Sequence, residues 1–229
     1  DWSSDVCSSD LVAAGNYTPV PIQSYNSSSA ERNTSFTFPI NVSLYGGFAG
    51  TESNRSERDW TTNISILSGD ISGNGWDESN NQENSYHIIV PSDNTTIDGF
   101  LIRGGNANGT GLLSYGGGIY NSGKTLSVSH CRFEYNYAVN GGAIFSGGTW
   151  GTVDINDCVF AYNHAYSYGG AAYNYSGATP SYRRCIFENN HSDGAGGAMS
   201  NSYTGTRPTV ENCVFIGNFA STSGGAIHG

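Results

Sequence analysis

The chain has 229 residues, of which 32 are glycine and only 12% are charged, and its formal net charge is −10. With Lys124 as the single lysine, it lacks the residues that fill exposed helix faces, which excludes a mainly helical protein. The acidic balance argues against binding to nucleic acid or anionic membranes, and no run of about 18 apolar residues predicts a transmembrane segment.

The two ends of the chain differ from the rest. Residues 1–11, DWSSDVCSSDL, resemble a translated sequencing adaptor and are interpreted as an artefact outside the fold. Without them the chain has 16 acidic and 9 basic residues, a net charge of −7, and four of its five cysteines. Residues 12–39, rich in serine, asparagine and proline, are predicted to form an irregular lead-in. The chain stops at GGAIHG without a capping sequence, so we expect a fragment truncated at the C-terminus.

Alternation of apolar and polar side chains predicts short strands through the rest of the chain. Upstream, it occurs in NVSLYGGF, NISILSGDI, SYHIIV and TIDGFLIRGGNA, at 41–48, 63–71, 85–90 and 96–107. From residue 116 the sequence repeats: four phrases of the form C-x-F-x-x-N begin 27, 27 and 28 residues apart, and five glycine phrases, GGGIYN to GGAIHG, lie between and around them.

Each repeat contains three short alternating segments separated by bends, and one repeat cannot bury its apolar face alone. The pattern therefore predicts an all-β fold, a single-stranded parallel β-helix over residues 40–229. One turn of this helix, called a rung below, takes about 27 residues, and roughly six to seven rungs are expected.

Equivalent residues of successive rungs stack into columns. Cysteines with Cα atoms about 4.8 Å apart and parallel side chains fit disulfides poorly, so we interpret them as small buried residues. Two disulfides are the alternative, and without a C-x-x-C pair the cysteines are not expected to bind metal.

The phenylalanines are predicted to form the aromatic spine of the core. The asparagines are placed at a turn, where this residue tolerates left-handed backbone and stacked amides bond from rung to rung. Paired glycines would provide positive φ or close backbone approach. The columns are Cys131, Cys158, Cys185 and Cys213; Phe133, Phe160, Phe187 and Phe215; and Asn136, Asn163, Asn190 and Asn218.

The GGA[ILV] and F-x-x-N phrases resemble the repeat of polymorphic outer-membrane proteins. The upstream phrases YGGFAGTE, ILSGDI and IDGFLIRGGNANG are similar to those of secreted bacterial β-helix proteins that share the pectate lyase fold. The resemblance implies a right-handed helix, located extracellularly or on the bacterial cell surface or outer membrane. It implies a role in adhesion, with a polysaccharide, a glycan or a host or surface protein as partner.

Two outward rows are candidate binding surfaces. Tyr120, Phe145 and Tyr173 share one position, and such aromatic rows fit the faces of sugar rings. Val159, Ile186 and Val214 form an apolar row suited to a protein partner, although a flanking loop could also cover it. A structural spacer that binds nothing is a further alternative.

A polysaccharide lyase or glycoside hydrolase is the enzymatic alternative, because the same fold supports both. Its candidate catalytic residues are Asp70, Asp98 and Arg103. Only a lyase would need Ca²⁺, and no other cofactor is expected. The repeat residues themselves are interpreted as structural.

Charged residues and histidines recur at fixed positions. Asp157 and Arg184 share one repeat position, and Arg183 and Glu211 share another, which predicts ion pairs between rungs that mainly set register. His164 and His191 follow the turn asparagine in successive rungs, with Asp193 nearby. They are candidate metal ligands, but a surface row of stacked rings is the favoured interpretation.

Overall fold

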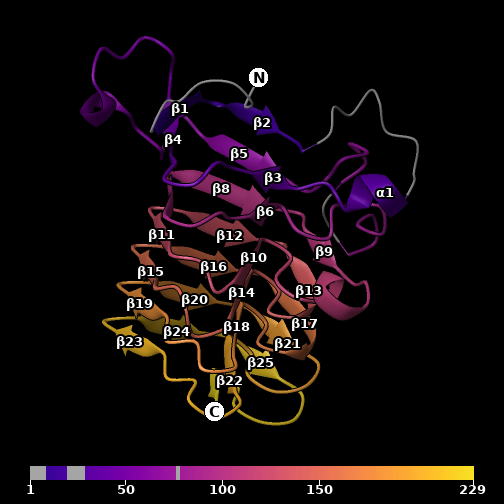
Figure 1. The fold of residues 1–229 in the computed structure, drawn as a ribbon. Coiled ribbons are helices and arrows are strands. Elements are labelled where there is room, and N and C mark those ends of the chain that lie inside the picture. Colours follow the sequence, from indigo (N-terminus) through magenta and orange to yellow (C-terminus); the bar gives the residue numbers. More distant parts are fainter. Residues whose placement is uncertain (1–8, 20–28, 76–77) are drawn as a thin grey trace.

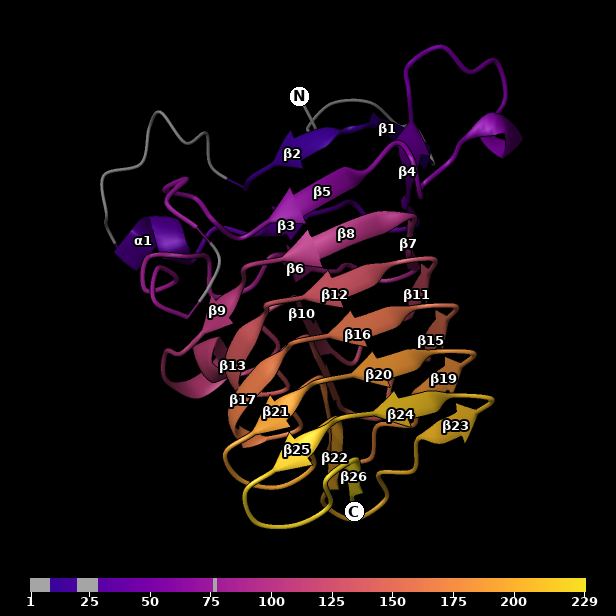
Figure 2. The same cartoon turned by 180° about the vertical axis from the view of Figure 1, so that it is seen from behind.

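The computed structural model describes residues 9–19, 29–75 and 78–229, and its strands form a parallel β-solenoid. Three sheets have seven strands each and a fourth has five, and every strand pair is parallel. The strands of each sheet stack one above the other from the N-terminal to the C-terminal end (Figure 1 and Figure 2). This confirms the predicted all-β, parallel β-helical class.

The four sheets are designated A to D. Sheet A contains β1 (Ser9–Ala13), β4 (Ser43–Phe48), β7 (Thr95–Asp98), β11 (Leu126–Ser129), β15 (Val153–Asn156), β19 (Ser181–Arg183) and β23 (Thr209–Glu211). Sheet B contains β2 (Gly15–Tyr17), β5 (Ser65–Ser68), β8 (Phe100–Arg103), β12 (Arg132–Glu134), β16 (Val159–Ala161), β20 (Ile186–Glu188) and β24 (Val214–Ile216).

Sheet C contains β3 (Phe36–Thr37), β6 (Ile89–Val90), β10 (Ile119–Ser122), β14 (Ile144–Gly147), β18 (Ala172–Tyr175), β22 (Met199–Ser202) and β26 (Ile227–His228). Sheet D contains β9 (Asn106–Ala107), β13 (Tyr137–Asn140), β17 (His164–Tyr168), β21 (His191–Ser192) and β25 (Phe219–Ala220). Outside the sheets lie α1 (Ser29–Arg32) and two 3₁₀ helices, η2 (Arg55–Glu57) and η3 (Gly111–Ser114).

The regular part of the solenoid comprises about five rungs of about 28 residues, fewer than the six to seven expected, because the segments upstream of β7 do not form regular rungs. In sheet A, Ile97 pairs with Val128, and the column continues through Ile155, Tyr182 and Val210. Before β7 the rungs carry long excursions, because β4 and β7 pair although 46 residues of chain separate them. Strands upstream of residue 40 also join the sheets, since β1, β2 and β3 pair with β4, β5 and β6.

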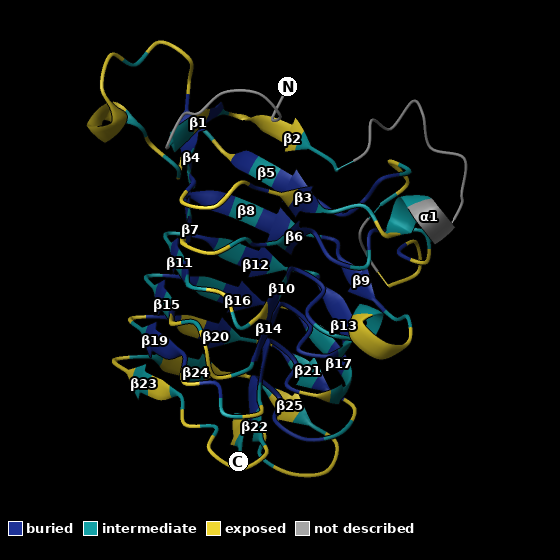
Figure 3. Ribbon diagram, in the orientation of Figure 1, coloured by how far each residue is buried: buried dark blue, intermediate teal, exposed yellow. Residues whose placement is uncertain are grey.

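The interior is a continuous core of stacked side chains. The phenylalanine column stacks face to face, with ring centroids 4.9, 4.7 and 4.7 Å apart. The cysteines form a parallel inward column of free thiols, so the structure contains none of the disulfides kept as an alternative among its described residues. Figure 3 shows that strands in the middle of the solenoid are largely buried, whereas the excursions and the end strands β2, β23 and β24 are more exposed.

The asparagine column is fully buried at Asn136, Asn163 and Asn190, and its amides bond from rung to rung. The backbone differs from the expected one, because the left-handed residue is the one before each asparagine. These preceding residues are Tyr135, Tyr162, Asn189 and Gly217, with φ between 50° and 62°. The asparagines therefore act through their side chains, which satisfy backbone groups that the bend leaves unpaired.

Candidate functional site

An aromatic cluster covers part of the outer face of sheet C. Tyr120, Phe145 and Tyr173 pair in register, and their ring centroids are 5.3 and 6.1 Å apart along the column. Phe145 and Tyr173 are nevertheless only 6% and 5% exposed. The expected open ladder is thus mostly covered, because three tyrosine rings from other positions in the sequence pack onto it. These rings are Tyr115, Tyr168 and Tyr175.

Between the cluster and η3 lies a pocket of about 270 Å³. Its walls include the rings of Tyr115, Tyr120, Phe145 and Tyr175, together with Leu112. The remaining lining residues are Ser122, Gly147, Gly148 and Ser176, so no charged side chain of the described chain lines the pocket. The pocket offers aromatic faces beside neutral hydroxyl groups.

His87 closes the N-terminal end of this aromatic column. Its ring stacks on Tyr120 with centroids 5.0 Å apart, and its Nδ1 lies 3.1 Å from the carbonyl oxygen of Gly116. Burial lowers the pKa of His87 to about 4, because the charged imidazolium would lose its hydration. The folded protein therefore holds His87 neutral at pH 7.

Acidification is expected to destabilise the fold through His87. The unfolded chain protonates this residue near pH 6.5 and the folded chain only near pH 4, so stability at neutral pH is lost as the pH falls between these values. The loss reaches up to about 3 kcal/mol. Urea unfolding of the wild type and of His87→Gln at pH 7 and pH 4.5 measures the difference in pH dependence. His228→Gln is the control, and equal pH dependence in all three proteins would contradict the expectation.

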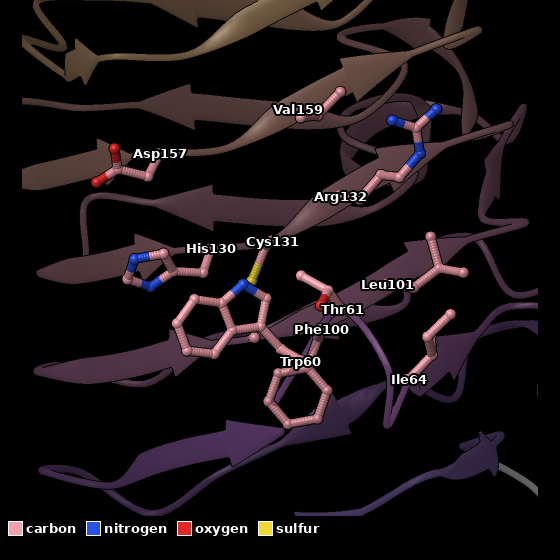
Figure 4. A pocket seen from close by; sticks show the side chains of 11 residues that line it. Trp60, Thr61, Ile64, Phe100, Leu101, His130, Cys131, Arg132, Asp157 and Val159 are labelled. Carbon is pink, nitrogen blue, oxygen red and sulfur yellow. The ribbon is translucent and has the colours of Figure 1, made fainter. Parts of the chain in front are cut away.

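A second pocket, of about 300 Å³, lies between sheet B and the excursion that carries Trp60 (Figure 4). The Trp60 ring lies 4.5 Å from that of His130, centroid to centroid. Asp98 is held by Arg58, 2.9 Å from one carboxylate oxygen, and by Nδ1 of His130, 3.0 Å from the other. The excursion is thus anchored to the bend between sheets A and B.

The predicted apolar row continues from this pocket along sheet B. Val159, Ile186 and Val214 pair in register, and Ile186 and Val214 are 37% and 48% exposed. Arg132 precedes Val159 in the same row and forms ion pairs with Glu134 and Glu188, at 2.9 and 3.3 Å. The row lies beside charged side chains, and its use as a partner surface stays a prediction.

The structure brings Asp70 near Arg103, because Ser68 pairs with Arg103 and Asp70 follows two residues later, but Asp98 does not join them. Asp70 accepts hydrogen bonds from the backbone N–H groups of Gly73, Asn74 and Gly75, so its carboxylate shapes the loop after β5. Asp98 is the last residue of β7 on sheet A, whereas Arg103 is the last residue of β8 on sheet B and lies 4.0 Å from Glu134. The enzymatic alternative stays a prediction without a paired carboxylate site at these positions.

The ion pairs between rungs lie at the expected repeat positions. Arg184 binds Asp157 with both guanidinium contacts at 2.6 and 2.7 Å, and Arg183 lies 3.0 Å from Glu211. On sheet D, His164 and His191 are neighbours in one column between Tyr137 and Phe219. Both imidazoles lie within 3.3 Å of Asp193.

Comparison with known families gives one match. Residues 212–229 match the model of the Chlamydia polymorphic membrane protein repeat. This segment contains the last cysteine phrase and the last glycine phrase, so the chain carries this repeat on a parallel β-solenoid. No curated protein and no solved structure matches the chain. No helix in the described ranges is long and apolar enough to span a bilayer.

Proposed function

From a parallel β-solenoid that carries a polymorphic membrane protein repeat, we propose a bacterial protein that binds carbohydrate at the aromatic pocket on sheet C. The observation that carries the proposal is the lining of this pocket, which combines four aromatic rings with tyrosine and serine hydroxyls and no charge. Aromatic rings pack against the C–H faces of sugars, and hydroxyl groups exchange hydrogen bonds with sugar hydroxyls. A neutral glycan is therefore the favoured ligand.

We infer the handedness, location and adhesive role of the protein from its likeness to this repeat. Polymorphic membrane protein repeats support a right-handed solenoid, a secreted or outer-membrane location and a role in adhesion to a glycan or to a host protein. The low charge of the chain is consistent with an extended surface of hydroxyl, amide and aromatic groups. A structural spacer would need no such pocket, and an enzyme would need acidic groups in it.

Replacement of Tyr120 by alanine is expected to weaken glycan binding about tenfold or more, because it removes one aromatic wall of the pocket. A glycan array with neutral and acidic oligosaccharides identifies ligands, and calorimetry measures the dissociation constants. Tyr162→Ala is the matched control, since Tyr162 is 45% exposed and lies outside the pocket. Absence of glycan binding by the wild type, or equal loss in both variants, would refute the proposal.

A further inference from the structure

Sheet D places two histidines at equivalent positions of adjacent rungs. The rings of His164 and His191 stack with centroids 4.8 Å apart and planes 16° from parallel. Tyr137 and Phe219, the neighbours above and below, meet this pair edge-on at 6.0 and 5.2 Å. The two imidazoles are thus confined along the column, from above by Tyr137 and from below by Phe219.

Asp193 faces both rings. Its Oδ1 atom lies 3.2 Å from Nε2 of His164 and 3.3 Å from Nε2 of His191. Its backbone N–H donates to the carbonyl oxygen of Ala165 at 3.0 Å, which fixes the carboxylate over the adjacent rung. One ligand atom from each of the three residues lies within 4.8 Å of the others.

The ring nitrogen of His191 has an unusual environment. Its Nε2 is shielded from solvent and forms no hydrogen bond, although it lies 3.3 Å from Asp193, because the contact lacks hydrogen-bond geometry. A shielded nitrogen without a hydrogen-bond partner costs free energy unless another atom occupies its lone pair. A bound cation would satisfy this nitrogen and the nearby carboxylate together.

A further carboxylate approaches from a different part of the chain. Oε1 of Glu78, in the excursion between β5 and β6, lies 3.7 Å from Nδ1 of His164. This is the ring nitrogen that does not face Asp193. Histidines that bind a metal commonly present their other ring nitrogen to a carboxylate, which fixes the tautomer and raises ligand basicity. Glu78 is placed for this role.

We propose that His164, His191 and Asp193 form a binding site for a divalent transition metal, with Zn²⁺ as the best match. Two imidazoles and one carboxylate are ligands that Zn²⁺ accepts, and a water molecule completes four-coordination. Ligand atoms of a tetrahedral zinc site lie about 3.3 Å apart, as follows from bonds of about 2.0 Å. The two distances to Asp193, 3.2 and 3.3 Å, fit this separation.

The stacked rings must tilt toward each other on binding, because imidazole lone pairs lie in the ring plane. The metal would then connect two adjacent rungs and, through Glu78, the excursion between β5 and β6. The site is independent of the carbohydrate pocket, which lies on sheet C.

Calorimetric titration of the purified, metal-free chain with Zn²⁺ tests the proposal. We expect one ion bound per chain. His191→Gln and Asp193→Asn are each expected to weaken binding at least tenfold, and Glu78→Gln about tenfold. Circular dichroism of the metal-free variants establishes that they keep the fold.

Two control variants exclude binding elsewhere. His228→Gln removes a partly buried histidine of sheet C, and Cys213→Ser removes the most accessible thiol of the column. Both variants are expected to bind Zn²⁺ as the wild type does. Titration with Co²⁺ should produce visible absorption bands that disappear in His164→Gln. Absence of Zn²⁺ binding by the wild type, unchanged binding in His191→Gln, or loss of binding in either control would overturn the proposal.

Discussion

Asn163→Ala is expected to destabilise the solenoid by about 4 to 6 kcal/mol, because it breaks four buried hydrogen bonds in three rungs. The Asn163 amide oxygen accepts from the backbone N–H and the side-chain amide of Asn136, at 3.2 and 3.0 Å. Its amide nitrogen donates to the Phe133 carbonyl oxygen and to the Asn190 amide oxygen, both at 3.0 Å. Each partner left unsatisfied and buried costs about 1–3 kcal/mol.

Urea unfolding followed by circular dichroism measures this effect, and Asn218→Ala provides the matched control. Asn218 makes the equivalent contacts with Asn190 and with the Phe187 carbonyl oxygen, but it is only partly buried. Water can replace its partners, so a loss of about 1 to 2 kcal/mol is expected. Asn163→Asp keeps the two contacts in which the amide oxygen accepts and loses the two in which the amide nitrogen donates. Its loss of stability should therefore be larger than that of Asn218→Ala. Equal losses at positions 163 and 218 would show that burial of the column does not determine its contribution.

The repeat made the solenoid predictable because each rung buries its apolar side chains in the same way, against the rungs next to it. A phenylalanine or asparagine that recurs every 27 or 28 residues occupies the same position in each rung, so its side chains form one column in a stack of parallel strands. Periodicity locates a bend without identifying which residue takes the left-handed backbone. Tyr135 and Tyr162 adopt that conformation although tyrosine has no preference for it, and the asparagine side chains then bond buried backbone carbonyl groups.

The candidate sites depend on segments that do not repeat, and sequence periodicity could not place them. Arg58 and Trp60 belong to an excursion whose path is fixed by contacts with Asp98 and His130, which lie 40 and 70 residues further along the chain. Glu78 reaches His164 from a similar excursion. Tyr168 and Tyr175, which cover part of the Tyr120 column, belong to repeating strands, but the preceding rung has Asn140 and Gly147 at their positions. The sequence contains no spacing from which these contacts could be predicted. It shows only that aromatic and charged residues occur inside otherwise polar excursions.

Gly170→Ala is expected to destabilise the protein by about 4 kcal/mol or more, although the change adds one methyl group. A Cβ atom at Gly170 would overlap the carbonyl oxygens of Gly197 and His191 in the next rung. Both obstacles are backbone atoms, so relief requires separation of stacked rungs, which exceeds the usual cost of overpacking of about 1–3 kcal/mol.

Gly225→Ala is the matched control, because Gly225 occupies the same repeat position and a Cβ there meets only the Asn218 carbonyl oxygen at 3.5 Å. The φ angle of neither glycine lies in the left-handed region, so backbone strain does not separate the two variants. Urea unfolding should show a loss of less than about 1 kcal/mol for Gly225→Ala. If both variants lose the same stability, the cost arises from the added methyl group in either rung and not from the close approach of stacked backbones. If the difference is as expected, the second glycine of a GGA phrase is required wherever a following rung lies against it, which explains why the phrase recurs with the period of the solenoid.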